Sequence, residues 1–177
     1  MKKLLLIFCM VAQSILLHAE GFEAGVRFGM CASQVDGDHL VGFNKAGLLG
    51  GITLSRAISE RSSLNMEMIF IQKGSVKPTN TDDNTYYRMR LAYVEVPFLW
   101  RWSAGKRISF EAGPAFGVLV SSREDDQLGE LKYAPPFKKM EYSFNAGLDY
   151  RLDDHWMVDA RNSFSVVPIR NFAGAQN

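Results

Sequence analysis

Residues Met140 to Leu152 alternate between apolar and polar side chains almost without interruption. Because successive side chains of a β-strand point to opposite faces, the pattern predicts a strand with one apolar face and one polar, charged face. A strand in a soluble protein averages roughly 5–6 residues, whereas a tilted strand that crosses a bilayer needs about 9–11. The segment therefore has the length of a membrane-crossing strand.

The same period of two recurs in six other segments, and helical periodicity is nowhere as regular. We expect strands at about 22–34, 45–58, 63–73, 86–102, 107–121, 140–152 and 156–167. The connections alternate in length, with long polar loops at 35–44, 74–85 and 122–137 and short turns at 59–62, 103–106 and 153–155. Long loops on one side and short turns on the other are typical of outer-membrane β-barrels, so we expect an all-β, antiparallel, up-and-down transmembrane barrel.

The first 19 residues have the organisation of a secretory signal peptide. Lys2 and Lys3 precede an apolar stretch from Leu4 to Leu17, and Ala19 ends a cleavage site. The stretch is shorter than the ~20 residues of a spanning helix, which argues against an N-terminal anchor. We therefore expect residues 1–19 to be removed on export and residues 20–177 to form one outer-membrane β-barrel domain.

Charge and cysteine content exclude several classes of protein. Without Lys2 and Lys3, 18 basic residues (20 − 2) face 19 acidic ones, and such a balance argues against a nucleic-acid partner. With Cys9 removed in the signal peptide, only Cys31 is left, so neither an internal disulfide nor a cysteine-based metal site can form. We expect no cofactor.

Two features concern the ends of the strands. Trp100, Trp102 and Trp156 lie beside short turns, where we expect them to form an aromatic belt at the periplasmic interface. Bacterial single-chain barrels have an even number of strands, and we find seven. The polar segment 168–177 offers no further strand, and we expect that the chain is truncated before an eighth.

Four segments together resemble the PorT-like outer-membrane β-barrel proteins of Bacteroidetes. They are the opening strand Gly25–Gly29, the segment Met66–Gly74, the Tyr-x-Glu-x-Pro element within Leu91–Leu99, and the Gly-Pro element within Ala112–Gly117. The resemblance covers nearly all of the mature chain and implies an eight-stranded antiparallel barrel in the outer membrane. A founding member of the family is associated with type IX protein secretion, but most members have no assigned activity, and fold transfers better than function. We infer no secretion role.

The polar faces of the expected strands collect many ionisable residues. An eight-stranded barrel is just wide enough for side chains to fill it, so we expect these residues to pair across the interior and plug it. The pair Asp149/Arg151 and the pair Asp159/Arg161 lie on adjacent strands, so we expect the two pairs to meet cross-strand. The inward residues are Glu23, Arg27, Glu67, Lys73, Glu95, Arg101, Glu111, Glu141, Asp149, Arg151, Asp159 and Arg161, with Cys31 as a small filler.

No catalytic residue and no metal site is expected. His39 lies in a long loop and His155 in a short turn, and neither belongs to a nucleophile or metal motif. The serines at 62, 63, 121 and 122 are interpreted as strand ends, and Gly113-Pro114 as a bulge. The acidic loop residues Asp36, Asp38, Asp82, Asp83, Glu124, Asp125 and Asp126 lack the spacing of a calcium loop and are interpreted as solvated acids.

The sequence thus predicts a monomeric, non-enzymatic outer-membrane barrel that contacts lipid and, through its long loops, other envelope proteins. Its expected role is structural or one of surface interaction. The alternative is a soluble, secreted, lipocalin-like barrel that binds a small apolar ligand. The two differ in sidedness, because the lipocalin-like barrel would turn its apolar face inward and the membrane barrel would turn it outward.

Overall fold

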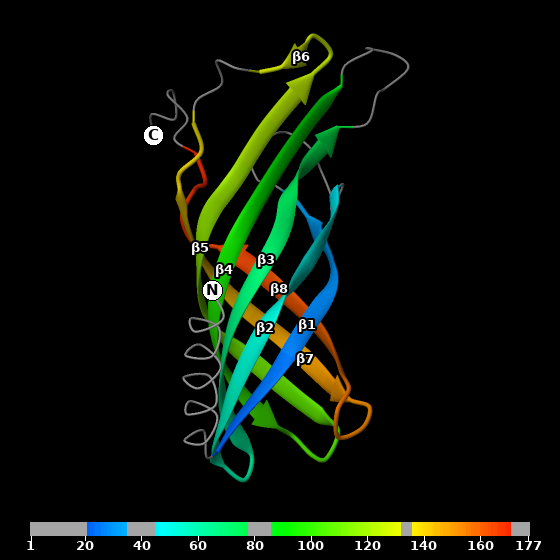
Figure 1. Cartoon of the computed structure of the whole chain (residues 1–177), viewed down its shortest axis with the longest axis vertical. Coiled ribbons are helices and arrows are strands. Elements are labelled where there is room, and N and C mark those ends of the chain that lie inside the picture. Colours follow the sequence, from blue (N-terminus) through cyan, green and yellow to red (C-terminus); the bar gives the residue numbers. More distant parts are fainter. Residues whose placement is uncertain (1–20, 35–44, 78–85, 132–135, 171–177) are drawn as a thin grey trace, which may run out of the picture.

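The computed structural model describes residues 21–34, 45–77, 86–131 and 136–170, which form one antiparallel sheet (Figure 1). All seven expected strands are present, and the expected signal peptide lies outside the described residues. No helix in the described part of the chain has the length and apolarity to cross a membrane. The strands are β1 (Phe22–Ser33), β2 (Lys45–Ser59), β3 (Ser62–Lys77), β4 (Tyr87–Ser103), β5 (Ile108–Asp126), β6 (Gly129–Glu130), β7 (Met140–Arg151) and β8 (Met157–Ser165).

The sheet curls into an elongated barrel wall with an open side (Figure 1). Its long strands follow the order β1-β2-β3-β4-β5-β7-β8, and the two-residue strand β6 pairs only with β5. Among the described residues, no strand pairing joins β1 to β8, and we call this gap the seam. The expected all-β antiparallel fold of the barrel type is confirmed.

The strand register corrects one prediction and extends another. Gly113 and Pro114 pair in unbroken register with Asn145 and Phe144 of β7, so the bulge predicted there is wrong. Pro114 lacks an N–H and thus omits a ladder bond without shifting the pairing. The shift lies between Ala92 and Tyr93 of β4 instead. Strand β5 continues to Asp126, which places the serines at 121 and 122 inside the strand and not at its end.

Two inward-facing glycines allow the wall to curl. A Cβ atom at Gly51 would lie 2.0 Å from the carbonyl oxygen of Met68, and one at Gly113 would lie 2.0 Å from that of Phe98. Only a residue without a side chain allows the neighbouring backbone to approach so closely. Glycine at these positions therefore brings β2 against β3, and β5 against β4.

The sidedness of the wall decides between the two predicted classes of barrel. Glu67 and Glu111 inside the wall are each only 3 % exposed, whereas Phe110 and Phe116 on its outer face are 48 % and 44 % exposed. A lipocalin-like barrel requires the opposite arrangement, so that alternative is wrong. The large apolar outer face is the surface that a hydrocarbon environment would cover.

Aromatic side chains are arranged in rows on the outer face. Phe116 lies between Phe98 and Tyr142, with ring centroids 6.2 Å and 5.8 Å apart and edge-to-face geometry. Trp100, Trp102 and Trp156 are exposed at the end that carries the short turns, as the belt prediction requires. We call this end the short-turn end and the opposite one the long-loop end.

Candidate functional site

The interior of the barrel wall holds a group of seven charged side chains, which we call the central ion cluster. It consists of the arginines 27, 101 and 161 with the carboxylates of Glu67, Glu111, Asp149 and Asp159. These residues come from β1, β3, β4, β5, β7 and β8, so the cluster connects nearly every long strand. The period of two in each strand directs all seven to the same side of the sheet.

Arg161 of β8 lies at the centre of this cluster. Its guanidinium donates to both carboxylate oxygens of Glu67, at 2.8 Å and 3.1 Å, and its Nε donates to Glu111 at 2.7 Å. Arg27 of β1 donates to Glu67 at 2.8 Å and also to Asp159 of β8. The Arg27–Asp159 contact spans the seam with side chains where no strand pairing does.

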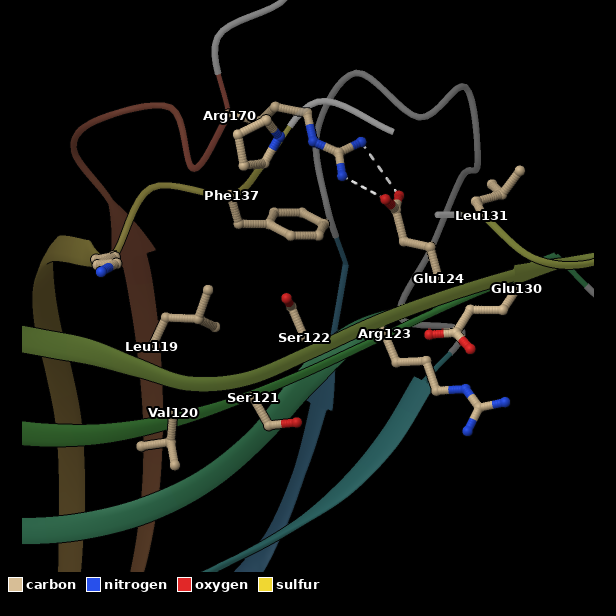
Figure 2. A pocket seen from close by; sticks show the side chains of 12 residues that line it. Leu119, Val120, Ser121, Ser122, Arg123, Glu124, Glu130, Leu131, Phe137 and Arg170 are labelled. Atoms are coloured by element: carbon tan, nitrogen blue, oxygen red, sulfur yellow. Dashed lines mark hydrogen bonds and ion pairs between the residues drawn. The ribbon is translucent and has the colours of Figure 1, made fainter. Parts of the chain in front are cut away.

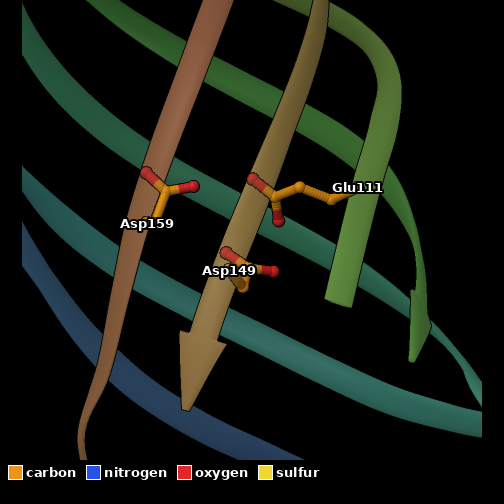
Figure 3. A group of neighbouring side chains, drawn as sticks. All are labelled: Glu111, Asp149 and Asp159. Carbon is orange, nitrogen blue, oxygen red and sulfur yellow. The ribbon is translucent and has the colours of Figure 1, made fainter. Parts of the chain in front are cut away.

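Three of the carboxylates lie together and resemble a metal site at first sight. Single oxygens of Glu111, Asp149 and Asp159 lie within 4.8 Å of one another, and Figure 3 shows the three side chains converging from β5, β7 and β8. Each of them is engaged by an arginine: Arg101 lies 3.2 Å from Glu111 and 2.6 Å from Asp149, and Arg27 contacts Asp159. The arginines supply the positive charge that a cation would bring, so we assign the group to the ion cluster.

A second charged group lies closer to the long-loop end. Lys73 of β3 lies 2.5 Å from Glu95 and 3.0 Å from Glu141, and its ammonium is 5.5 Å from the ring centroid of Tyr93. Ser165 of β8 donates to Glu141 at 2.5 Å. This Lys73 group contains one cation and two carboxylates, and it fills the interior above the central ion cluster.

The interior becomes apolar at the long-loop end. Met89, Leu91 and Tyr93 are buried and pack with partly buried neighbours, among them Phe137 and Ile169. The alternation of polar and apolar residues does not predict this layer. Two of its members, Phe137 and Ile169, come from segments interpreted as loops. The signals were the apolar residues Met89 and Leu91 at inward positions of β4 and the isolated Ile169 near the end of the chain.

Arg170 lies above this apolar layer at the mouth. Its guanidinium lies 3.9 Å from the ring centroid of Phe137 and forms a two-fold contact with Glu124, which also accepts a hydrogen bond from Tyr87. Figure 2 shows Phe137 and Arg170 above β5, beside an open hollow of about 580 Å³. Phe137, Glu124 and Arg170, which cover part of the mouth, all come from segments that the sequence analysis interprets as polar loops.

The loop acids at 124–126 are engaged by protein groups. Glu124 contacts Arg170, Asp125 contacts Arg90 at 2.6 Å and Arg123 at 2.9 Å, and Asp126 accepts from a backbone N–H at 2.7 Å. The hydrogen bonds from Arg90 and Arg123 hold the pKa of Asp125 below its usual range. The acids at 36, 38, 82 and 83 and His39 lie outside the described residues.

The predicted ionic pairing of Asp149 and Arg151 with Asp159 and Arg161 across the two strands is wrong for the described residues. Asp149 pairs in register with Asp159, and its ionic partner is Arg101 of β4. Arg151 lies at the last position of β7, where its side chain is exposed. Arg161 lies 3.6 Å from Asp159 of its own strand, and its shorter ion pairs are with Glu67 of β3 and Glu111 of β5. His155 is exposed in its turn, and Cys31 faces the interior, with its Sγ 3.0 Å from the carbonyl oxygen of Gln72.

Comparison with known proteins agrees with this geometry. A search among curated proteins finds no match. Residues 11–171 match the family described as "Outer membrane protein beta-barrel domain", and the match includes every strand of the sheet. With its apolar outer face and charged interior, the chain belongs to this family of outer-membrane β-barrel proteins.

Proposed function

We propose that this protein is a PorT-like outer-membrane barrel that acts without catalysis, as a plugged scaffold that presents an interaction surface outside the cell. The observation that carries the proposal is the filled interior. Ion pairs that share arginines occupy its middle, and an apolar layer lies at the long-loop end. Contacts inside such a barrel stabilise its wall. The loops and the strand ends that extend beyond the membrane are then available to bind partners.

The ion pairs resist the opening of a water path. The side chains of Glu67 and Glu111 are only 2 % and 1 % exposed, and each lies against Arg161. Separating such a buried pair leaves an uncompensated charge, which costs about 3–5 kcal/mol. Because several pairs share arginines, a channel would require many contacts to break together.

The surface at the long-loop end supports an interaction role. Strands β4 and β5 have 17 and 19 residues, whereas about 9–11 cross a bilayer, so their upper parts extend beyond the membrane. The parts of β4 and β5 that extend beyond the membrane carry polar side chains, including Arg90, Arg123 and Asp125. Leu128 at its tip is 91 % exposed. An apolar tip above a charged base is a surface suited to contact with other envelope proteins.

Three further parts of the proposal rest on sequence. The elements that resemble the PorT-like proteins of Bacteroidetes lie on β1, β3, β4 and β5, and they place Tyr93, Glu95 and Pro97 inside the wall. The signal-like N-terminus supports export, with the long-loop end outside the cell and the short turns in the periplasm. We expect the protein to be a monomer.

Conductance in planar lipid bilayers tests the plug. The full chain, reconstituted from outer membranes, is expected to give no steady ionic current. The variant Arg27→Ser/Arg161→Ser, which removes two of the three guanidiniums that fill the middle, is expected to show current if these groups block it. A porin-like current through the unmodified protein would overturn the scaffold proposal.

Protease treatment of intact cells tests the exposed surface. Trypsin is expected to cut at Arg123 or at Lys138 and Lys139 without permeabilisation, because these residues lie at the long-loop end. Cleavage there only after the outer membrane has been permeabilised would place this end in the periplasm and contradict the proposal.

A further inference from the structure

The outer face of β3, β4 and β5 changes from apolar to cationic near the long-loop end. The change occurs over three successive rows, and each row consists of residues that the strand register places directly opposite one another. Their side chains point away from the buried layer around Leu91 and Tyr93, because alternate residues of a strand face opposite sides. From the short-turn side, the rows are Phe70–Val94–Val118, Gln72–Ala92–Ser121 and Gly74–Arg90–Arg123. In a lipid monolayer, acyl chains, hydroxylated groups and charged phosphates follow one another in the same order.

The length of β4 places the cationic row at the edge of the membrane. Trp102 lies at the short-turn interface, and about 9–11 strand residues cross a bilayer, so the crossing part of β4 extends from Trp102 to about Val94 or Ala92. Arg90 is the next outward residue. It lies 12 positions (102 − 90) from Trp102, which at about 3.3 Å per residue and a strand tilt of about 40° is roughly 30 Å along the membrane normal. Because the apolar band of such barrels is about 25 Å tall, Arg90 and Arg123 lie at the level of the lipid headgroups.

Arg90 and Arg123 form a like-charged pair that one carboxylate holds together. They are directly opposite in the register, an arrangement that is destabilising by itself. Asp125 lies 2.6 Å from Arg90 and 2.9 Å from Arg123, and it accepts a hydrogen bond from one nitrogen of each guanidinium. The two arginine side chains are 43 % and 53 % exposed, and Figure 2 shows Arg123 on the side of β5 opposite to Glu124. A guanidinium has five N–H donors, so both arginines can donate to a ligand on the outer surface.

The carboxylates near this pair lie on its far side from the bilayer. Arg88 of β4 is in register with Asp125, and Asp125 is in register with Glu130 of β6. Both acids are therefore one row further from the bilayer than Arg90 and Arg123. In these two rows of β4, β5 and β6, three arginines and two carboxylates leave an excess of one positive charge (3 − 2), and the row on the membrane side is uncharged. An anion at the membrane surface therefore meets the guanidiniums first.

We propose that Arg90 and Arg123 bind a phosphate group of a phosphorylated glycolipid in the outer leaflet of the membrane. A planar guanidinium matches the oxygens of a phosphate, and two adjacent guanidiniums supply a pair of such forks. The exposed Gln72 and Ser121 lie at the level of the sugar hydroxyls, and Val118, which is 50 % exposed, lies at the level of the acyl chains.

This site rests on the proposed function, because it requires the long-loop end to lie outside the cell. It also divides the part of the sheet that extends beyond the membrane. The glycolipid covers the base of this extension, at Arg90 and Arg123, and Leu128 at the tip is left to protein partners.

Binding of lipid A in detergent micelles tests the dependence on phosphate. The full chain, folded in dodecyl maltoside, is titrated with diphosphorylated lipid A, and native mass spectrometry measures the bound fraction. Lipid A from which the phosphates have been removed is expected to bind at least ten-fold more weakly. This comparison uses the unmodified protein, so it does not depend on the folding of a variant. Equal affinity for the two lipids would overturn the site.

Matched variants test the two arginines. Arg90→Ser/Arg123→Ser is expected to lower the affinity for diphosphorylated lipid A at least ten-fold. Arg56→Ser/Arg107→Ser removes two exposed arginines near the short-turn end and should leave the affinity unchanged. The compact band on unheated gels confirms that both variants fold. An equal loss in the two variants would mean general attraction of anionic lipid and would overturn the site.

Competition separates a lipid site from a site for a free anion. Excess inorganic phosphate is expected to leave the binding of lipid A within two-fold, because the apolar row adds contacts that free phosphate lacks. Displacement of lipid A by inorganic phosphate would assign the arginines to a soluble anion. Loss of binding in EDTA would mean that a divalent cation bridges the lipid to carboxylates, and either result would overturn the proposal.

Photo-cross-linking in cells tests the location of the site and keeps both arginines intact. A photo-reactive residue at Ser121 is expected to capture outer-leaflet glycolipid, whereas the same residue at Ile108, near the short-turn end, is not. Capture of protein alone at Ser121 would overturn the glycolipid site and leave the scaffold proposal standing. Capture of glycolipid at Ile108 and not at Ser121 would contradict the orientation on which both proposals rest, even if lipid A binds in micelles.

Discussion

Arg161 of β8 and Glu67 of β3 form a two-fold contact across the interior, with N–O distances of 2.8 Å and 3.1 Å between residues 94 positions apart in the chain. The side chain of Glu67 is 2 % exposed and that of Arg161 is 11 % exposed. The guanidinium plane matches the carboxylate plane, which gives this pair both strength and direction. The contact therefore ties an edge strand of the sheet to its middle.

Replacing Glu67 with alanine is expected to destabilise the folded protein by about 3–5 kcal/mol, because Arg161 and Arg27 would lose their shared carboxylate while they stay buried. Urea unfolding in phosphatidylcholine vesicles, followed by tryptophan fluorescence, measures the change. Glu60→Ala in the exposed β2–β3 turn is the control and should stay within about 0.5 kcal/mol. A loss below 1 kcal/mol for Glu67→Ala would show that the pair is not a major constraint.

The double variant Glu67→Met/Arg161→Met should recover much of that loss. Two apolar side chains of similar length leave no unpaired charge at the contact, and such replacements are often neutral or stabilising. Arg27 keeps Asp159 as a partner in this variant. The same unfolding assay measures it. A double variant as unstable as Glu67→Ala would mean that Arg161 stabilises the fold mainly through Glu111.

Gly113→Ala is expected to destabilise the protein by about 1–3 kcal/mol, because the new methyl group would lie 2.0 Å from the carbonyl oxygen of Phe98. Thermal unfolding, read as the loss of the compact band on unheated gels, measures the effect. Gly105→Ala is the matched control, since a Cβ there meets nothing within 4 Å. Equal behaviour of the two variants would show that β4 and β5 can separate without cost.

The strands and their sidedness could be predicted from the sequence because both depend on local alternation. Phe116, Glu67 and Asp149 each lie on the predicted face. The alternation no longer predicts the direction of a side chain where a strand ends. Arg151 is the last residue of β7, and its side chain is exposed, so the prediction that it faces the interior is wrong.

The partners inside the barrel could not be predicted in the same way. Arg27 and Asp159 are 132 positions apart, and their contact depends on how strongly the sheet curls and how its strands are staggered. The contact of Arg170 with Glu124 depends on a chain reversal after β8, which has no periodic signal. Charge alone indicated that these residues would pair, and only the curvature of the sheet selects which ones meet.

Phe116→Arg is expected to cost about 1–2 kcal/mol, because it places a charge on the lipid-facing side of β5 between the bilayer midplane and its interface. Leu128→Arg, at a tip that is 91 % exposed, is expected to change the stability by no more than about 0.5 kcal/mol. Folding yield and urea unfolding in vesicles measure both variants. If Phe116→Arg were tolerated as well as Leu128→Arg, the outer face would not contact hydrocarbon.

Asp153 organises the turn between β7 and β8 and makes it sensitive to acid. Its carboxylate accepts hydrogen bonds from the backbone N–H groups of His155 at 2.7 Å and Trp156 at 2.8 Å, and these bonds hold its pKa below the usual range. Because the folded-state pKa lies below the unfolded one, the stabilisation is complete above the unfolded pKa, near 3.9, and is lost as the pH falls through the folded pKa.

NMR titration of the Asp153 carboxyl carbon in detergent-solubilised protein measures this pKa directly. Asp154→Asn should leave it nearly unchanged, and an Asp153 pKa at or above 3.9 would show that the two hydrogen bonds do not persist in solution.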